Sequence, residues 1–366
     1  MRSKDEIYAK ALGAEHLTPE EALFIYNHSP LSELMMLGSI IRQKLVPGNN
    51  VGWIIDRNVN ITNICFSQCK FCNFCRKPGD PDTFITGIDD YRKKIKELFE
   101  KGGDQLLLQG GMHPSLGLKF YTDLFRQLKS EFPGLKLHAL GPPEVVHLAR
   151  FEKSSYNDVL TELIDAGLDS LPGAGAEILD DRVRGIVSPA KASTSEWLEV
   201  MRQAHIINLP TSATMMYGHI ETMEERIMHL IRLRELQDEK PAGHYGFITF
   251  IPWPFQDKGT VLARKHKVYN NTGTIDYIRL IAISRIVLNN ISNIQSSILT
   301  TGRNAALATL HAGANDLGSV MIEENVVSAA GSSGMLNAEQ LQGIIREAGF
   351  QPVLRNQKYE IIENRK

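Results

Sequence analysis

Short apolar runs alternate with longer amphipathic segments from about residue 51, and this alternation limits the possible folds most strongly. Helical segments separate the runs, and two of them begin with capping boxes, at Ser193 and at Thr222. The apolar runs lie at 59–62, 105–109, 136–140, 168–172, 211–216 and 247–251, with weaker candidates at 293–298 and 317–322. Strands that alternate with helices form βαβ units and a parallel sheet. We therefore predict an α/β fold, a TIM-like (β/α) barrel with a partial or complete set of eight units.

The regions before and after these runs suggest a division of the chain. Residues 1–50 have a helical pattern and are predicted to form an N-terminal helical extension, with Thr18 as a helix cap and Pro19 in the first turn. We expect the barrel to span 51–350, and a tail with a short strand to occupy 351–366. No linker rich in Pro, Gly or Ser interrupts the chain.

Charge and hydropathy exclude several classes of protein. The 366 residues include 40 Lys and Arg against 42 Asp and Glu, so the net charge of −2 indicates neither nucleic-acid nor membrane-surface binding. The first residues lack the apolar stretch of a signal peptide, and no apolar run approaches the roughly 20 residues of a membrane span. We expect a cytoplasmic protein, because clustered cysteines without an export signal argue against disulfides.

All four cysteines of the chain lie on one short stretch, at Cys65, Cys69, Cys72 and Cys75. Thiolates are soft metal ligands, so several of them on one loop can surround a single metal centre. A closed zinc site is one interpretation, but zinc sites usually join Cys pairs from separate segments. Crowding on one loop after a strand favours an iron–sulfur cluster, with zinc or redox chemistry as the alternative.

The turns after the predicted strands carry the other candidate residues, because the active sites of such barrels lie at the C-terminal ends of the strands. Gly and Pro are expected in these turns, whereas a concentration of His, Glu and Trp is less expected. The residues of this kind are His113, His138, Glu144, Glu177, His219 and Trp253.

The cysteine loop resembles the motif of radical S-adenosylmethionine enzymes, C-x3-C-x2-C with an aromatic residue before the third cysteine. The matching residues are Cys65, Cys69, Phe71 and Cys72. The resemblance implies a [4Fe–4S] cluster held by three cysteines, with S-adenosylmethionine chelated at the fourth iron and cleaved to a 5′-deoxyadenosyl radical. An open coordination position is required for this chemistry, so Cys75 is interpreted as a thiol that does not bind the cluster.

The same resemblance assigns two groups of backbone contacts with S-adenosylmethionine. One group matches the Gly-Gly motif whose main chain meets the methionine amino group, and it consists of Gln109, Gly110 and Gly111. The other matches the segment whose main chain binds adenine, and it consists of Met216, Tyr217 and Gly218. Glycine allows the main chain to approach a ligand closely, although a plain tight turn also explains Gly110 and Gly111.

Charged side chains complete the expected cofactor site. Glu177 resembles the acidic residue that contacts the ribose hydroxyls, with a carboxylate at a helix N-terminus as the alternative. Arg182 or Arg184 would pair with the methionine carboxylate, and a solvated helix face is the alternative for both.

Longer stretches resemble the futalosine-pathway group of this superfamily and its deazaflavin-pathway cousins, from about residue 50 to 350. Among them, FIPWPFQ and GSVMIEENVVSAAG are most like the members that cyclise dehypoxanthine futalosine in menaquinone biosynthesis, although Pro254 stands where Thr is more usual. The implied reaction begins with hydrogen abstraction from C4′ of this nucleoside-derived substrate. The carbon radical then adds to the benzoate ring, and loss of an electron and a proton restores aromaticity. Trp253 and Phe255 are candidate walls for the substrate.

The turns after the predicted strands also supply candidates for the proton acceptor, and the implied chemistry requires an electron donor. The candidate acceptors are His113, His138, His219 and Glu144, each of which could instead be a cap or a structural partner. A low-potential electron donor of the flavodoxin or ferredoxin type is the implied partner.

The alternative functions are aminofutalosine synthase or a deazaflavin-precursor synthase within the superfamily, and a non-catalytic zinc-binding module outside it.

Overall fold

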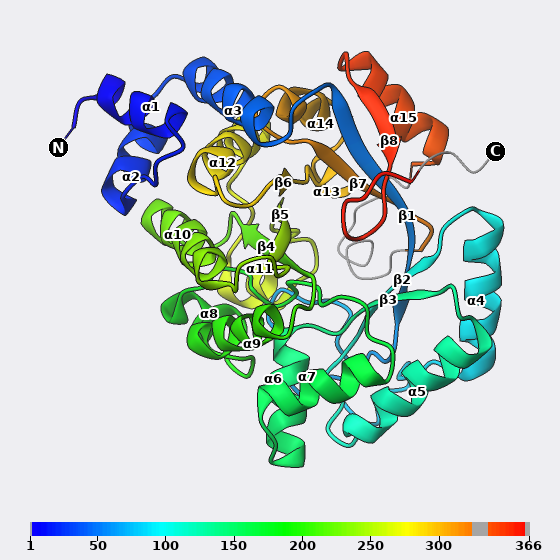
Figure 1. Cartoon of the computed structure of the whole chain (residues 1–366). Helices are drawn as coiled ribbons and strands as arrows, with labels where there is room; N and C mark the ends of the chain where they lie inside the picture. Colours follow the sequence, from blue (N-terminus) through cyan, green and yellow to red (C-terminus); the bar gives the residue numbers. More distant parts are fainter. Residues whose placement is uncertain (1, 324–335, 363–366) are drawn as a thin grey trace.

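A ring of parallel strands surrounded by helices forms the centre of the molecule (Figure 1). The computed structural model describes residues 2–323 and 336–362. Hydrogen-bonded strands give one sheet of order β3-β2-β1-β7, in which β8 also pairs with β1, and a second of order β4-β5-β6. Isolated bridges join the two sheets through Ser170, Leu171 and Gln295, so the ring closes and the predicted barrel is confirmed.

One or more helices separate each strand from the next. The strands are β1 (Asn50–Asn60), β2 (Gln105–Gln109), β3 (Lys136–Ala139), β4 (Thr211–Tyr217), β5 (Phe247–Pro254), β6 (Asn293–Ile294), β7 (Asp316–Met321) and β8 (Gln351–Leu354). The helices around them are α4 (Ile88–Glu100), α5 (Leu118–Glu131), α6 (Pro142–Glu152), α7 (Tyr156–Asp165), α8 (Asp181–Val187), α9 (Thr194–Ile206), α10 (Met223–Glu239), α11 (Val261–His266), α12 (Thr274–Val287), α13 (Ile298–Thr301), α14 (Arg303–Leu310) and α15 (Ala338–Glu347).

Three N-terminal helices pack on the outside of the ring, α1 (Lys4–Leu12), α2 (Pro19–His28) and α3 (Leu31–Leu45). Helix α3 lies against α12, and α2 lies against α10 (Figure 1). The predicted start of α2 is confirmed, because the Thr18 side chain accepts a hydrogen bond from the Glu21 amide and Pro19 occupies the first turn. The capping boxes predicted at Ser193 and Thr222 are also present.

Two strands differ from the prediction. β1 begins nine residues earlier than predicted, because its polar Asp56 and Arg57 obscure the strand pattern. Arg57 points outward, where Glu97 lies 2.5 Å and Glu323 lies 3.0 Å from its guanidinium. The run at 168–172 forms only the bridges of Ser170 and Leu171, since Pro172 has no N–H to continue the ladder.

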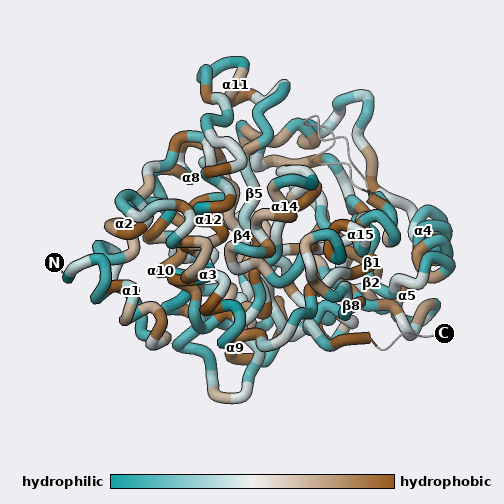
Figure 2. Tube along the Cα trace, turned by 90° about the horizontal axis from the view of Figure 1, so that it is seen from above, coloured by the Kyte–Doolittle hydropathy of each residue, from teal (hydrophilic) through white to brown (hydrophobic). Residues whose placement is uncertain are grey.

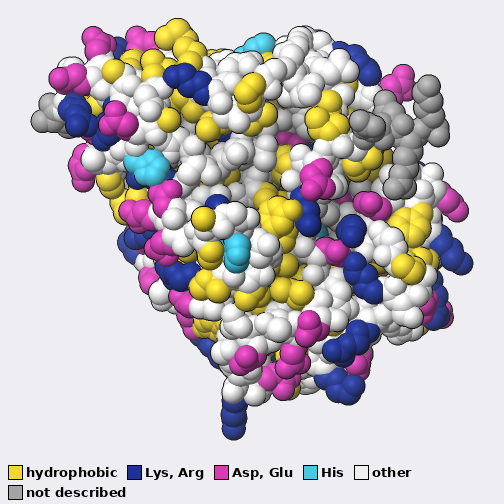
Figure 3. All heavy atoms as spheres, viewed as in Figure 1, with side chains coloured by type: hydrophobic (Ala, Val, Ile, Leu, Met, Phe, Trp, Pro, Cys, Tyr) yellow, Lys and Arg dark blue, Asp and Glu magenta, His cyan; other side chains and the backbone are white. Residues whose placement is uncertain are grey.

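The surface and the core show the expected separation of polar and apolar residues. Figure 2 shows hydrophilic segments along the outer helix α4, and α11 projecting at one end of the molecule. Acidic and basic side chains are interspersed over the face seen in Figure 3, in keeping with the net charge of −2. Among the described residues, no helix combines the length and apolar character needed to cross a bilayer.

Candidate active site

The cysteine loop follows β1 directly and is braced by three parts of the fold. The Phe66 amide donates to the carbonyl of Met112 after β2, at 3.1 Å. The Lys70 amide donates to the carbonyl of Val187 in α8, at 2.9 Å, and its own carbonyl accepts from the amide of Leu262 in α11. These bonds hold the loop at the end of the barrel where the strands finish, as the sequence predicts for an active site.

The four thiols differ in their surroundings. Burial raises the pKa of Cys69 to about 11 and also raises the pKa of Cys72. A hydrogen bond from the Cys75 thiol lowers the pKa of Cys65 to about 6. Cys75 also lies 3.4 Å from the main-chain oxygen of Cys65, to which its Sγ donates. Cys75 therefore acts as a hydrogen-bond donor beside Cys65.

Gly110 and Gly111 pack directly against the start of the cysteine loop. A Cβ added at Gly110 would lie 2.9 Å from the carbonyl oxygen of Thr62, and one at Gly111 would lie 2.2 Å from that of Ile64. The Gly111 amide donates to Thr62 at 2.7 Å. The close approach of the two backbones thus explains both glycines, and their contact with the methionine amino group stays a prediction.

Replacing Gly111 with alanine is expected to lower the stability of the holoenzyme by about 1–3 kcal/mol, because the new Cβ overlaps main-chain atoms that cannot move aside easily. The matched control is Gly343→Ala on the exposed side of α15, where a Cβ meets nothing within 4 Å. That change should leave stability equal or raise it by about 0.5–1 kcal/mol. Thermal unfolding of both variants tests the contact, and equal melting temperatures would contradict it.

A buried ion pair lies between the cysteine loop and the barrel interior. The Lys191 Nζ is 2.7 Å from the Glu177 carboxylate and lies over the ring of Phe71, 5.2 Å from its centroid. Burial by itself would lower the pKa of Lys191, but the neighbouring Cys69 and Glu177 raise it above its usual value. Glu177 adopts a left-handed backbone conformation, with φ of +40°, which is strained for a residue with a side chain.

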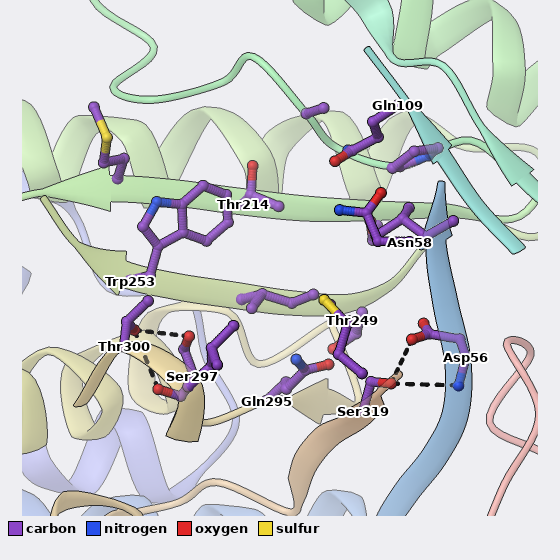
Figure 4. Close-up of a pocket in the computed structure, with 18 of the residues that line it drawn as sticks. Asp56, Asn58, Gln109, Thr214, Thr249, Trp253, Gln295, Ser297, Thr300 and Ser319 are labelled. Carbon is purple, nitrogen blue, oxygen red and sulfur yellow. Dashed lines mark hydrogen bonds between the residues drawn. The ribbon is translucent and has the colours of Figure 1, made fainter. Parts of the chain in front are cut away.

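Below this ion pair, the barrel interior is open. A cavity of about 380 Å³ extends from Cys72 and Phe71 down to the opposite end of the ring. Barrels of this type usually fill their interior with branched aliphatic side chains. Here, neutral hydrogen-bonding side chains of several strands also face the cavity, as Figure 4 shows for Asn58, Gln109, Thr214, Thr249, Gln295 and Ser319.

The structure brings many of the predicted residues together at this cavity. The side chains that line it include Phe71, Cys72, Gln109, His138, Glu177, Met216, Trp253 and Phe255. Trp253 comes from the end of β5 and projects into the cavity near Thr214 (Figure 4). Tyr217 points elsewhere, because its ring stacks with Tyr277 at 6.4 Å, so only its main chain could contact a ligand in the cavity.

Three of the four candidate proton acceptors lie outside the cavity lining. The His219 Nε2 donates to the carbonyl of Met216 at 3.0 Å, and its Nδ1 accepts from the Ile220 amide. The His113 Nδ1 accepts from the amide of Ser115. Both rings therefore serve as local hydrogen-bond partners in the turns. Glu144 is buried at the start of α6, and burial raises its pKa to about 7.

His138 is the candidate that faces the cavity. Its Nδ1 lies 2.7 Å from the hydroxyl of Ser170, and burial lowers its pKa to about 3. The imidazole is therefore neutral near pH 7 and only weakly basic.

The two arginines expected at the methionine carboxylate are engaged elsewhere. Arg182 is half exposed and forms a bidentate ion pair with Glu225, at 2.6 Å for both contacts. Arg184 is buried and donates to the carbonyls of Gly175, Ala176 and Ala192. Their side chains are turned away from the cavity, whereas Lys191 lines it together with Phe71 and Cys72. No motif in the sequence pointed to Lys191, which lies in the turn between α8 and α9.

Solved structures identify the class of fold. Methylornithine synthase (PylB) matches with a TM-score of 0.69 and 17% identity, over 96% of this chain and 98% of that chain. HydG, a maturase of the [FeFe]-hydrogenase, matches with a TM-score of 0.72 and 15% identity, over 97% and 76%. The radical SAM superfamily model matches residues 59–233, and the model of the CofH/MqnC C-terminal region matches 244–366. The protein is thus a radical S-adenosylmethionine barrel enzyme.

Relatives that align over nearly the whole chain define the family more closely. Identity is 40% with cyclic dehypoxanthine futalosine synthase of Streptomyces coelicolor, over 97% of this chain and 88% of that protein. The protein of the same name from Halalkalibacterium halodurans is 39% identical over 98% and 95%. Aminodeoxyfutalosine synthase of Thermus thermophilus is 37% identical over 96% and 94%. The chain belongs to the radical S-adenosylmethionine family that contains these synthases, which confirms the resemblance found in its sequence.

Enzymes of this superfamily use a [4Fe–4S] cluster and S-adenosylmethionine, and the residues of this loop fit them. Cys65, Cys69 and Cys72 lie on one braced loop, and Cys72 faces the cavity. In the described part of the chain, no three His, Cys, Asp or Glu side chains converge closely enough for a single metal ion. A four-iron cluster binds each thiolate at a separate iron, so its ligands stay further apart.

Part of the GSVMIEENVVSAAG stretch, residues 324–331, lies outside the described residues.

Proposed function

We propose that this enzyme closes the ring of dehypoxanthine futalosine in the futalosine pathway to menaquinone. The observation that carries the proposal is the cavity inside the barrel, which opens beside the cysteine loop and is lined by neutral hydrogen-bonding side chains. Such a lining suits a hydroxylated, nucleoside-derived substrate better than a strongly charged one. The relatives of the same name, with identities of 40% and 39% over almost the whole chain, support the choice of substrate.

The upper end of the cavity is assigned to the cofactors. Cys65, Cys69 and Cys72 would hold the cluster, and Lys191 would pair with the methionine carboxylate in place of Arg182. When bound, the cluster and S-adenosylmethionine supply the 5′-deoxyadenosyl radical that takes hydrogen from C4′ of the substrate. The Glu177 carboxylate, fixed by Lys191 at 2.7 Å, is positioned to accept hydrogen bonds from ribose hydroxyls.

The walls of the cavity would hold the two reacting carbons of the substrate together. Trp253 and Phe255 provide rigid apolar surfaces near the cofactor end, which suit the benzoate ring and exclude water. His138 faces the same cavity, and the ring left after loss of the electron is strongly acidic, so we assign its proton to this imidazole although burial makes the imidazole a weak base.

The electron donor would dock at the outer side of the cysteine loop. Phe66 of this loop is 37% exposed, and Phe84 and Ile85, between the loop and α4, are 39% and 44% exposed. A low-potential protein of the flavodoxin or ferredoxin type fits this proposal, because the donor must approach the cluster closely.

The proposal is tested with cluster-reconstituted enzyme under anaerobic conditions, given S-adenosylmethionine, a reductant and dehypoxanthine futalosine. We expect 5′-deoxyadenosine to form in a substrate-dependent manner, together with a product that is two hydrogens lighter than the substrate. A reaction without substrate controls for cofactor cleavage by the reductant alone. Turnover only with the substrates of aminodeoxyfutalosine synthase would contradict the proposal and assign the chain to that activity.

A further inference from the structure

A short hairpin after β8 closes the lower end of the cavity. β8 pairs in parallel with Asn50–Trp53 at the start of β1, and Arg355 then pairs in antiparallel fashion with Ile361. Residues 355–361 are called the C-terminal hairpin below. Arg355, Gln357 and Tyr359 all line the cavity. The hairpin is therefore the floor of the barrel interior.

The floor is tied to the barrel strands by side-chain bonds. The Arg355 guanidinium contacts both carboxylate oxygens of Asp316 in β7, at 2.5 and 2.8 Å. The Tyr359 hydroxyl donates to Thr249 of β5 at 2.8 Å. The Gln357 amide oxygen accepts from Gln105 of β2 at 3.0 Å. These bonds fix the hairpin in place, so its inward groups have defined positions.

Tyr359 shows that this placement has an energetic cost. Its φ is +63°, in the left-handed region that bulky side chains rarely adopt. Such strain persists only where surrounding contacts impose it, and it is frequent at ligand sites. Here the contacts are the hydrogen bond to Thr249 and the stacking of the Arg355 guanidinium on the Tyr359 ring, 3.8 Å from its centroid.

The charges around the floor disfavour binding of the substrate carboxylate at this end of the cavity. Arg355 is the only cation among the described residues that line the floor, and Asp316 already neutralises it. Asp56 of β1 adds a second carboxyl group, which accepts a hydrogen bond from Ser319 (Figure 4). A substrate carboxylate would meet no free positive charge here, whereas hydroxyl groups would find both donors and acceptors.

We propose that the C-terminal hairpin is the specificity element of the cavity, and that Gln357, Tyr359 and Asp56 bind the hydroxyl-bearing ring of the substrate. This inference rests on the proposed function, since it assumes a substrate with a hydroxylated ring at one end and a benzoate at the other. The benzoate would then lie at the upper end, beside Trp253. The hairpin also sets the depth of the cavity and thereby the length of substrate that fits.

The test compares Gln357→Ala and Tyr359→Phe with a matched control, Lys358→Ala, whose side chain lies between them in sequence but is exposed. All are assayed as full-length, cluster-reconstituted enzyme with dehypoxanthine futalosine. We expect Gln357→Ala to raise KM about tenfold and Tyr359→Phe to raise it a fewfold, because each loses a hydrogen bond to substrate. Lys358→Ala should leave both KM and the substrate-independent formation of 5′-deoxyadenosine unchanged, because its side chain is exposed.

A substrate analogue that lacks a ring hydroxyl separates recognition from a structural effect. For this analogue, the wild-type KM should already be raised, and Gln357→Ala or Tyr359→Phe should add little, because the partner group is missing. Unchanged KM values in both hairpin variants would overturn the inference, and so would an equal loss of substrate-independent cofactor cleavage. If the wild-type enzyme does not convert dehypoxanthine futalosine, the proposed function fails first and the inference with it.

Discussion

The variant Cys72→Ala is expected to lose nearly all of its cluster iron and at least about 1,000-fold of its 5′-deoxyadenosine formation, because a [4Fe–4S] cluster with three thiolate ligands cannot spare one. Cys72 faces the cavity from the braced loop, so its sulfur lies on the side where the cofactor must bind. Iron and sulfide content after anaerobic reconstitution, with the brown absorption of the cluster, measures the first loss. Chromatography of the nucleoside products measures the second.

Cys75→Ala is the matched control for this experiment. Its thiol donates to the main-chain oxygen of Cys65 at 3.4 Å, and it lowers the pKa of Cys65 to about 6. Removing the Cys75 thiol should leave the iron content at about four atoms per chain. Loss of iron from Cys75→Ala to the same extent as from Cys72→Ala would mean four thiolate ligands and no open iron. That result would contradict the radical mechanism.

The second large effect is expected at Lys191. Replacing it with methionine should reduce 5′-deoxyadenosine formation about 100-fold, because it removes the proposed partner of the methionine carboxylate, and loss of one partner of a buried charge pair weakens binding by about 3 kcal/mol. Glu177 would then be a buried carboxylate without its cation. The rate of S-adenosylmethionine cleavage with chemical reductant, measured at several cofactor concentrations, gives both the maximal rate and the apparent affinity.

Two further variants distinguish cofactor binding from a folding defect. The double variant Lys191→Met with Glu177→Gln removes both charges, so it should fold like the wild type and still cleave S-adenosylmethionine poorly. Arg182→Met should cleave it normally, because Arg182 is turned outward to Glu225. Cleavage at the wild-type rate by the double variant would contradict the role of Lys191. A strong defect in Arg182→Met would instead indicate that Arg182 binds the methionine carboxylate, as the sequence first suggested.

The architecture could be predicted because it depends on repeated local signals. Apolar runs such as 105–109 and capping boxes such as that at Ser193 are short-range features, and the structure confirms them. The pattern failed where a strand carries polar residues inward, as with Asp56 in β1. It also failed at 168–172, where Pro172 leaves only isolated bridges. Both failures arise because tertiary position, and not local preference, decides the role of these segments.

The site could be predicted only in part. The spacing of Cys65, Cys69 and Cys72 is a local motif, whereas Lys191 reaches Phe71 of the cysteine loop from a turn, between α8 and α9, that has no motif of its own. The direction of a side chain is also absent from the sequence, so Arg182 and His219 were plausible until their contacts with Glu225 and Met216 were seen. The inward polar residues Asp56 and Asn58 left no alternating signal, because Arg57 between them is also polar.

The position of the hairpin along the chain has a consequence for biosynthesis. A ribosome makes a chain from its N-terminus, so all the barrel strands are synthesised before residues 355–361. These strands include β7 and β5, which carry the hairpin's partners Asp316 and Thr249. The floor of the cavity therefore follows every barrel strand in the order of synthesis, and the proposed contacts of 355–361 with the substrate can form only after those strands have been made.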